Sequence, residues 1–119
     1  MVDKLRVRVF EKRQDMGRQA GADAAECMIR MLREKDAINV MFAAAPSQNE
    51  TLAALCRIPG IDWNRVNAYH MDEYVGLDGG HPAGFGNYLK RTVFGRLPLK
   101  SVHLINGNAE EPRQEAERY

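Results

Sequence analysis

Two neighbouring carboxylates, Asp72 and Glu73, are the residues of this sequence best suited to acid–base chemistry. They follow a short apolar segment that is typical of a β-strand, so a rigid strand end would carry them. A carboxylate that is partly desolvated at such a position can move a proton at a carbon next to a carbonyl group. The alternative is that both side chains cap backbone N–H groups of the following loop, and their spacing alone favours this alternative.

A second polar stretch, the turn at residues 45–48, also follows an apolar segment. Its candidate substrate-binding residues are Ala45, Ser47 and Gln48. Ser47 and Glu50 match a capping box, in which the Ser47 hydroxyl accepts from the Glu50 N–H and the Glu50 side chain returns to the Ser47 N–H. Because the Glu50 carboxylate would lie where an anion binds a helix N-terminus, we expect this turn to bind phosphate weakly or not at all.

Two other patterns carry less weight. The glycine-rich loop contains Gly84-Phe85-Gly86, but Leu89 stands where a phosphate-binding loop would have its third glycine. A mobile surface loop near the site is the better interpretation. His70, Asp72 and His81 lack the spacing of a known zinc site, so no metal site is predicted.

The segments that would position these groups alternate between strands and helices. A charged, alternating segment with Leu5, Val7 and Val9 predicts a strand at the edge of a sheet. The nearly continuous apolar run at residues 37–45 predicts a central strand of a parallel sheet. The remaining predicted elements are a helix at 12–35, a short helix after Ser47 that ends at Pro59-Gly60, a strand at 65–71, a helix from about His81 to Pro98, a strand at 102–105 and a last helix capped by Asn108 with Glu111.

This order predicts an α/β fold, a three-layer Rossmann-like sandwich with a mainly parallel sheet. The long helix would bury a stripe made of Ala20, Ala24, Cys27, Met28, Met31 and Leu32. Ligands bind beyond the carboxyl ends of such strands, so the two polar stretches share a crevice if their strands are neighbours. Because only three strong strands and an edge candidate are found, we expect the fold to be incomplete in this chain.

Length and composition restrict the function further. The 119 residues predict a single domain at 1–119, and a formal charge of +1 argues against nucleic-acid binding. No apolar stretch approaches the length of a membrane span, and the N-terminus has no secretory signal pattern. Cys27 and Cys56 lack metal spacing and are expected to be free thiols in a reducing cytoplasm.

One segment is more specific than these patterns. The sequence Asn67-Ala68-Tyr69-His70-Met71-Asp72-Glu73-Tyr74-Val75-Gly76-Leu77 contains MDEYVGL, and residues 104–109 read LINGNA. Together with the intervening His81-Pro82 and the aromatic helix that follows, they resemble the glucosamine-6-phosphate deaminase family, also called glucosamine-6-phosphate isomerase. The resemblance covers nearly all of this chain and the N-terminal part of the family domain, so the chain is expected to be the N-terminal part of a longer sugar-phosphate isomerase-like domain.

The resemblance implies an aldose–ketose isomerase that also deaminates glucosamine 6-phosphate, without a metal or organic cofactor. It implies a Rossmann-like fold shared with 6-phosphogluconolactonases, a sugar phosphate as the small-molecule partner, and self-association into a homo-oligomer. The residue that matches the family's proton carrier between C1 and C2 is Asp72, and Glu73 is its neighbour in the motif.

Two departures from the family pattern bear on function. The family has a turn rich in glycine and hydroxyl residues where this chain has Ala45 to Gln48, in which only Ser47 keeps a hydroxyl. The family's ring-opening histidine, lid and C-terminal phosphate ligands match no residue here, so this chain alone is expected to be catalytically incomplete. The alternatives are a lactone hydrolase, against which the intact MDEYVGL argues, a non-catalytic sugar-binding or regulatory domain, and a truncated remnant without activity.

Overall fold

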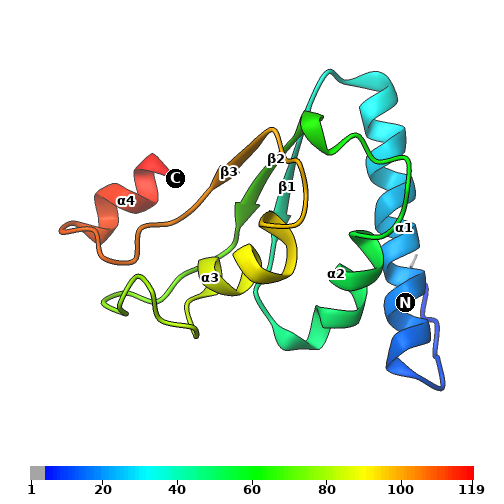
Figure 1. Cartoon of the computed structure of the whole chain (residues 1–119), viewed down its shortest axis with the longest axis horizontal. Helices are drawn as coiled ribbons and strands as arrows, with labels where there is room; N and C mark the ends of the chain where they lie inside the picture. Colours follow the sequence, from blue (N-terminus) through cyan, green and yellow to red (C-terminus); the bar gives the residue numbers. More distant parts are fainter. Residues whose placement is uncertain (1–4) are drawn as a thin grey trace.

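The computed structural model describes residues 5–119, and Figure 1 shows how their helices and strands are arranged. The helices are α1 (Arg13–Glu34), α2 (Asn49–Leu55), α3 (Phe85–Leu89) and α4 (Pro112–Arg118). The strands are β1 (Ile38–Phe42), β2 (Val66–His70) and β3 (Ser101–His103). Short 3₁₀ turns at Pro46–Gln48 and Trp63–Arg65 precede α2 and β2, and a π-helical turn at Lys90–Phe94 extends α3. Across the described residues, no helix has both the length and the apolar character that a bilayer crossing requires.

The three strands form one parallel sheet in the order β1-β2-β3. The pairing of β1 with β2 runs from Ile38 opposite Val66 to Phe42 opposite His70. Helical crossovers connect the strands, as parallel pairing requires. The prediction of an α/β fold with a mainly parallel sheet that is incomplete in this chain is therefore confirmed.

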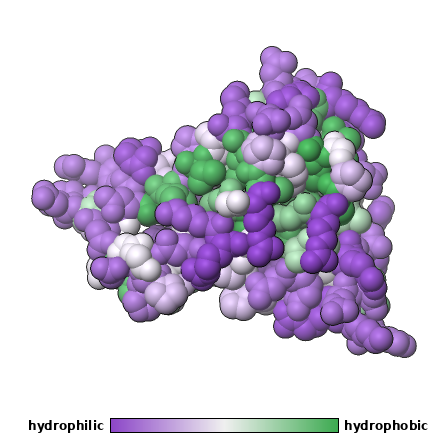
Figure 2. Space-filling view, viewed as in Figure 1, coloured by the Kyte–Doolittle hydropathy of each residue, from purple (hydrophilic) through white to green (hydrophobic). Residues whose placement is uncertain are grey.

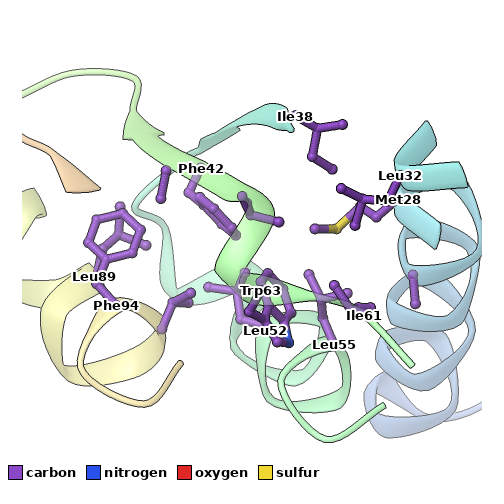
Figure 3. Packing of buried hydrophobic residues seen from close by; sticks show 14 residues of the cluster. Met28, Leu32, Ile38, Phe42, Leu52, Leu55, Ile61, Trp63, Leu89 and Phe94 are labelled. Atoms are coloured by element: carbon purple, nitrogen blue, oxygen red, sulfur yellow. The ribbon is translucent and has the colours of Figure 1, made fainter. Parts of the chain in front are cut away.

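One face of the sheet is packed against the helices, and this covered face holds the core. Alternation along β1 and β2 turns Ile38, Phe42, Val66 and Ala68 toward this face, where all are buried. Figure 3 shows Ile38 and Phe42 among side chains from α1, α2 and α3. The rings of Phe42 and Phe94 meet edge to face, with centroids 5.6 Å apart.

The opposite face of the sheet is more accessible. A polar row crosses it, in which Asn67 donates to the Asn39 side chain (2.9 Å) and accepts from the Ser101 hydroxyl (2.7 Å). Met41 on the same face is 57% exposed. On the covered side, Val102 of β3 lies opposite Ala68 and is still 40% exposed. Figure 2 shows apolar residues gathered across the middle of the view.

Glycines bring α1 and α2 close together. A Cβ on Gly17 would lie 2.4 Å from the Cβ of Glu50, and one on Gly21 would be nearly as crowded. The predicted helix is confirmed, but the predicted stripe is wrong at Cys27, which is exposed, because the contact with α2 turns the buried face toward the glycines. Both cysteines are free, as predicted. The buried residues of α1 are Gly17, Gly21, Ala25, Met28 and Leu32.

Three further predictions are wrong. Residues 5–9 form no strand: no strand within the described part of the chain pairs with them, and Arg8 binds Asp23 of α1 instead. The strand predicted to be central, β1, lies at an edge of the described sheet, because β2 and β3 both follow on the same side. Asn108 does not cap α4; its side-chain amide donates to the Leu77 carbonyl (2.7 Å), and Glu111 at the helix start makes no side-chain capping bond.

Candidate active site

The two polar stretches leave the sheet side by side. Because β1 and β2 are parallel neighbours, their carboxyl ends lie together, and the Met71 N–H donates to the Phe42 carbonyl at 3.1 Å. The strands are thus neighbours, the condition on which a shared crevice depends. The turn with Ala45, Ser47 and Gln48 and the loop with Asp72 therefore start at the same edge.

The turn after β1 is fixed by contacts that differ from the predicted capping box. Ser47 lies inside the 3₁₀ turn, and Gln48 is the N-cap of α2 without a side-chain capping bond. The Glu50 carboxylate binds Arg13 at 2.7 Å instead, which lowers the pKa of Glu50. The capping-box prediction is wrong because Arg13 of α1 lies within reach of Glu50 and outcompetes a local bond.

Two further hydrogen bonds connect this turn to neighbouring segments. The Gln48 amide donates to the Ala43 carbonyl, and the Tyr88 hydroxyl of α3 donates to the Ala45 carbonyl at 3.2 Å. The Ser47 hydroxyl is exposed and makes no hydrogen bond within residues 5–119. It is therefore available to a ligand, whereas Gln48 is already engaged.

Asp72 and Glu73, adjacent in sequence, have different surroundings. Asp72 is exposed, and its carboxylate makes no hydrogen bond to the described residues. The Glu73 carboxylate accepts three backbone N–H groups, from Tyr74 (3.0 Å), Phe85 (2.9 Å) and Gly86 (3.0 Å). Burial raises the pKa of Glu73, but these donors together outweigh it and hold the pKa below its usual value. Glu73 thus anchors the start of α3, and the Asp72 carboxylate is left accessible.

His70, the last residue of β2, is a site residue that the sequence analysis missed. Its side chain is fully buried, and its Nε2 accepts the Ile105 N–H at 2.8 Å. Burial lowers the pKa of His70, against the opposing effect of the Glu73 and Asp72 carboxylates. The alternation of Val66 and Ala68 along β2 was the signal that would have placed His70 on the covered face.

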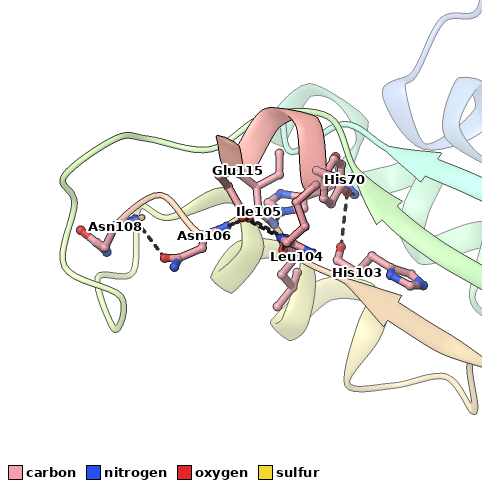
Figure 4. Close-up of polar contacts among 9 residues, drawn as sticks. His70, His103, Leu104, Ile105, Asn106, Asn108 and Glu115 are labelled. Carbon is pink, nitrogen blue, oxygen red and sulfur yellow. Dashed lines mark hydrogen bonds and ion pairs between the residues drawn. The ribbon is translucent and has the colours of Figure 1, made fainter. Parts of the chain in front are cut away.

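The segment at residues 104–108 packs tightly on the loop that follows Glu73. Figure 4 shows its polar contacts with His70 and Glu115. The Gly76 N–H donates to the Gly107 carbonyl at 2.9 Å. A Cβ on Gly107 would lie 2.1 Å from the Tyr74 carbonyl oxygen, so only glycine permits this approach. The Glu115 carboxylate of α4 accepts the Asn106 N–H at 2.7 Å, and Arg118 together with this donor lowers the pKa of Glu115 to about 2.

A hollow of about 110 Å³ lies between α3 and residues 104–108, with Glu73, Lys90 and Asn106 in its wall. Neither Asp72 nor Ser47 lines it; both lie at the exposed surface of the described chain. Within residues 5–119, no group of three or more His, Cys, Asp or Glu side chains is placed to hold a metal ion.

Comparison with curated proteins finds glucosamine-6-phosphate deaminases, whereas no family model matches the chain. The deaminase of Exiguobacterium sp. is 37% identical over 59 residues, which are 50% of this chain and 23% of that protein. The deaminase of Arthrobacter sp. is 32% identical over 99 residues, which are 79% of this chain and 38% of that protein. The matched part of the chain therefore spans well under half the length of these two relatives.

Comparison with solved structures finds the same fold. A monomeric glucosamine-6-phosphate deaminase, described as a missing link of the NagB superfamily, matches 97% of this chain and 48% of its own, with a TM-score of 0.81 and 20% identity. A 6-phosphogluconolactonase from Shewanella baltica matches 99% of this chain and 52% of its own, with a TM-score of 0.80 and 11% identity. In sequence this chain is thus related to part of the glucosamine-6-phosphate deaminases, and in structure it shares part of the fold of the NagB superfamily.

Proposed function

We propose that this chain carries the proton-transfer residue of a glucosamine-6-phosphate deaminase, an enzyme that isomerises an amino-sugar phosphate from aldose to ketose and releases ammonia. The observation that supports this most is the contrast between Asp72 and Glu73. Asp72 offers an unengaged carboxylate two residues beyond a rigid strand, and Glu73 fixes the loop that carries it. The two curated relatives described above, both named as deaminases, support the same choice.

In the proposed reaction the Asp72 carboxylate removes the proton from C2 of the open-chain aldose. This gives an enediol-like intermediate, and Asp72 returns the proton to C1. The amino group leaves as ammonia when water adds at C2 and the ketose forms. A carboxylate at an exposed strand end suits both transfers, because it can accept and return a proton and can reach two adjacent carbons.

The remaining roles belong to the same proposal. Ala45, Ser47 and Gln48 form the sugar-binding side of the crevice, with the free Ser47 hydroxyl as its donor. Glu73 contributes by holding the loop of Asp72. Residues 1–119 act as one α/β domain, the N-terminal part of a longer sugar-phosphate isomerase-like domain, which self-associates and needs further groups for turnover.

Two other functions compete with this one. The lactonase structure matches the fold as well as the deaminase structure does, so the fold does not distinguish lactone hydrolysis from deamination. The MDEYVGL segment favours the deaminase. A sugar-binding domain without turnover is the second alternative, favoured by the partial span of the chain.

The test is coupled detection of ammonia and fructose 6-phosphate from glucosamine 6-phosphate, on this chain and on the longest natural form of the protein. Turnover by the longer form supports the proposal. Hydrolysis of 6-phosphogluconolactone without ammonia release would replace it with the lactonase. Binding of glucosamine 6-phosphate by calorimetry, without either product, would replace it with a binding domain.

A further inference from the structure

His70 occupies an unusual place for a titratable side chain. It is fully buried, and its Nε2 accepts the N–H of Ile105 at 2.8 Å. Because Nε2 is the acceptor, the ring must be neutral and carry its proton on Nδ1. Nδ1 is buried as well and makes no hydrogen bond of good geometry among residues 5–119, although the Asp72 backbone lies near enough to raise the pKa of the ring.

This arrangement is costly, and the cost points to a role. A buried donor without a partner destabilises a fold by about 1–3 kcal/mol. An apolar side chain would avoid the cost, but it would leave the Ile105 N–H without its acceptor. The acceptor at Nε2 is therefore what His70 contributes here.

The Nε2–Ile105 bond joins two segments that surround Asp72. On one side, the His70 backbone N–H donates to the Tyr119 hydroxyl at 2.7 Å, which holds the end of β2. On the other side, Ile105 leads into Gly107, whose carbonyl accepts the Gly76 N–H from the loop beyond Glu73.

Asp72 thus lies between two anchors. Two residues before it, His70 binds Ile105; immediately after it, Glu73 binds the N–H groups of Phe85 and Gly86. Both anchors lie close to Gly86: a Cβ on this residue would lie 3.2 Å from Glu73 Oε2 and 3.6 Å from His70 Cε1. With both ends of this short stretch fixed, the backbone at Asp72 has little freedom to move, and this sets the position from which its carboxylate extends.

We propose that His70 is a positioning residue: its neutral Nε2 ties residues 104–108 to the end of β2 and so fixes the place of the Asp72 carboxylate. The proposal rests on the proposed function in one respect, that Asp72 is the proton carrier. The link to Ile105 itself is independent of any activity.

Protonation would break the link, because an imidazolium has no acceptor. The charged groups near His70 are the carboxylates of Glu73 and Asp72, which favour protonation, and Lys90, which opposes it; the Asp72 backbone also favours it. The Tyr119 hydroxyl binds the His70 backbone and not its ring. Burial outweighs the carboxylates and keeps the ring neutral at pH 7.

The test compares two variants of the full chain by amide hydrogen exchange. His70→Leu removes the acceptor and keeps an apolar side chain; His70→Gln keeps a polar end group of similar reach. We expect exchange of the Ile105 amide to accelerate about tenfold or more in His70→Leu and to stay near wild type in His70→Gln. The Ala68 amide, inside β2, reports global opening and should change less than Ile105. Equal acceleration of both amides, or His70→Gln behaving like His70→Leu, would overturn the proposal.

A second measurement keeps the proposal testable if His70→Leu does not fold. Nitrogen-15 imidazole spectra of the wild-type chain should show His70 with its proton on Nδ1 at neutral pH. On acidification below about 6.5, the ordinary pKa of histidine, Ile105 should lose protection as the ring becomes charged. This loss should be absent in His70→Gln. A proton found on Nε2 at neutral pH contradicts the proposal.

Turnover separates this proposal from the proposed function. In an active full-length form, His70→Leu should lower kcat with little change in KM, and His70→Gln should restore most of kcat. If the wild type turns over no glucosamine 6-phosphate, the proposed function fails while the Ile105 results still stand. If turnover is present and His70→Leu leaves both kcat and Ile105 exchange unchanged, the positioning role fails alone.

Discussion

The covered face of the sheet and its carboxyl edge are held by different forces. On the covered face, Ile38, Phe42, Val66 and Leu89 are buried against helices, and their stabilisation is apolar and without direction. At the carboxyl edge, directed hydrogen bonds such as those of Glu73 fix segments that expose much of their surface. Substitutions that keep the volume of a core side chain should therefore be tolerated better than those that change it. At the carboxyl edge, by contrast, the loss of a single hydrogen-bonding atom should be enough to release a segment.

The largest expected effect is on stability, and it distinguishes two neighbouring residues of β1 that point to opposite faces of the sheet. Phe42→Ala empties a buried site that is 5% exposed and should cost about 3–5 kcal/mol in the free energy of unfolding. Met41→Ala, one residue away on the opposite face and 57% exposed, should change it by less than about 0.5 kcal/mol. Urea unfolding of both variants measures the difference. Equal losses would mean that the two faces are not packed as described.

The next effect tests close backbone approach at the edge. Gly107→Ala places a Cβ 2.1 Å from the Tyr74 carbonyl oxygen, and we expect a loss of about 1–3 kcal/mol. Gly79→Ala is the matched control, because its Cβ would meet no atom within 4 Å. Thermal unfolding of the two variants should differ clearly; unchanged stability of Gly107→Ala would show that residues 104–108 do not pack on this loop.

A smaller effect is expected at Glu73. Glu73→Gln removes the charge that three backbone N–H groups share, and we expect a loss of about 1–2 kcal/mol at pH 7. Asp72→Asn serves as the control and should leave stability unchanged, since its carboxylate is unengaged. If Asp72→Asn destabilises the chain as much as Glu73→Gln, the division of labour between the two carboxylates is incorrect.

The smallest effect concerns acid stability. The pKa of Glu115 is lowered from 4.5 to about 2 in the folded protein. As the pH falls, Glu115 therefore binds a proton in the unfolded state before it does so in the folded state. Its contribution is therefore complete above about pH 4.5 and is lost between that value and about pH 2. Unfolding of Glu115→Gln should show a weaker pH dependence than wild type over this range. An identical pH dependence in both would contradict the Asn106 and Arg118 contacts.

Much of the fold could be predicted from the sequence, because apolar periodicity reports burial directly. The long helix, the strands at Ile38–Phe42 and Val66–His70 and the parallel sheet follow from such patterns. The prediction of a strand at residues 5–9 was wrong, because alternating apolar residues in a short charged segment do not by themselves provide a neighbouring strand to pair with. The rotation of the buried face of α1 was missed because Gly17 and Gly21 count as neither polar nor apolar, although they determine where α2 packs.

The candidate site was predictable in a different way. Strand ends and polar residue types located Asp72, Glu73 and Ser47, and the neighbouring positions of β1 and β2 bring their segments to one edge. Long-range contacts could not be predicted: Arg13 binding Glu50 joins residues 37 positions apart, and Ile105 binding His70 joins residues 35 apart. Which of two adjacent carboxylates is anchored depends on such contacts.

We propose that Asp72 is the reacting carboxylate and that Glu73 anchors the loop that carries it. The most direct measurement is the rate of ammonia and fructose 6-phosphate formation from glucosamine 6-phosphate by the longest natural form of the protein, wild type against Asp72→Asn. We expect Asp72→Asn to lose at least about a hundredfold in rate, with its binding of the sugar phosphate and its unfolding midpoint unchanged. Turnover by Asp72→Asn at the wild-type rate would contradict it.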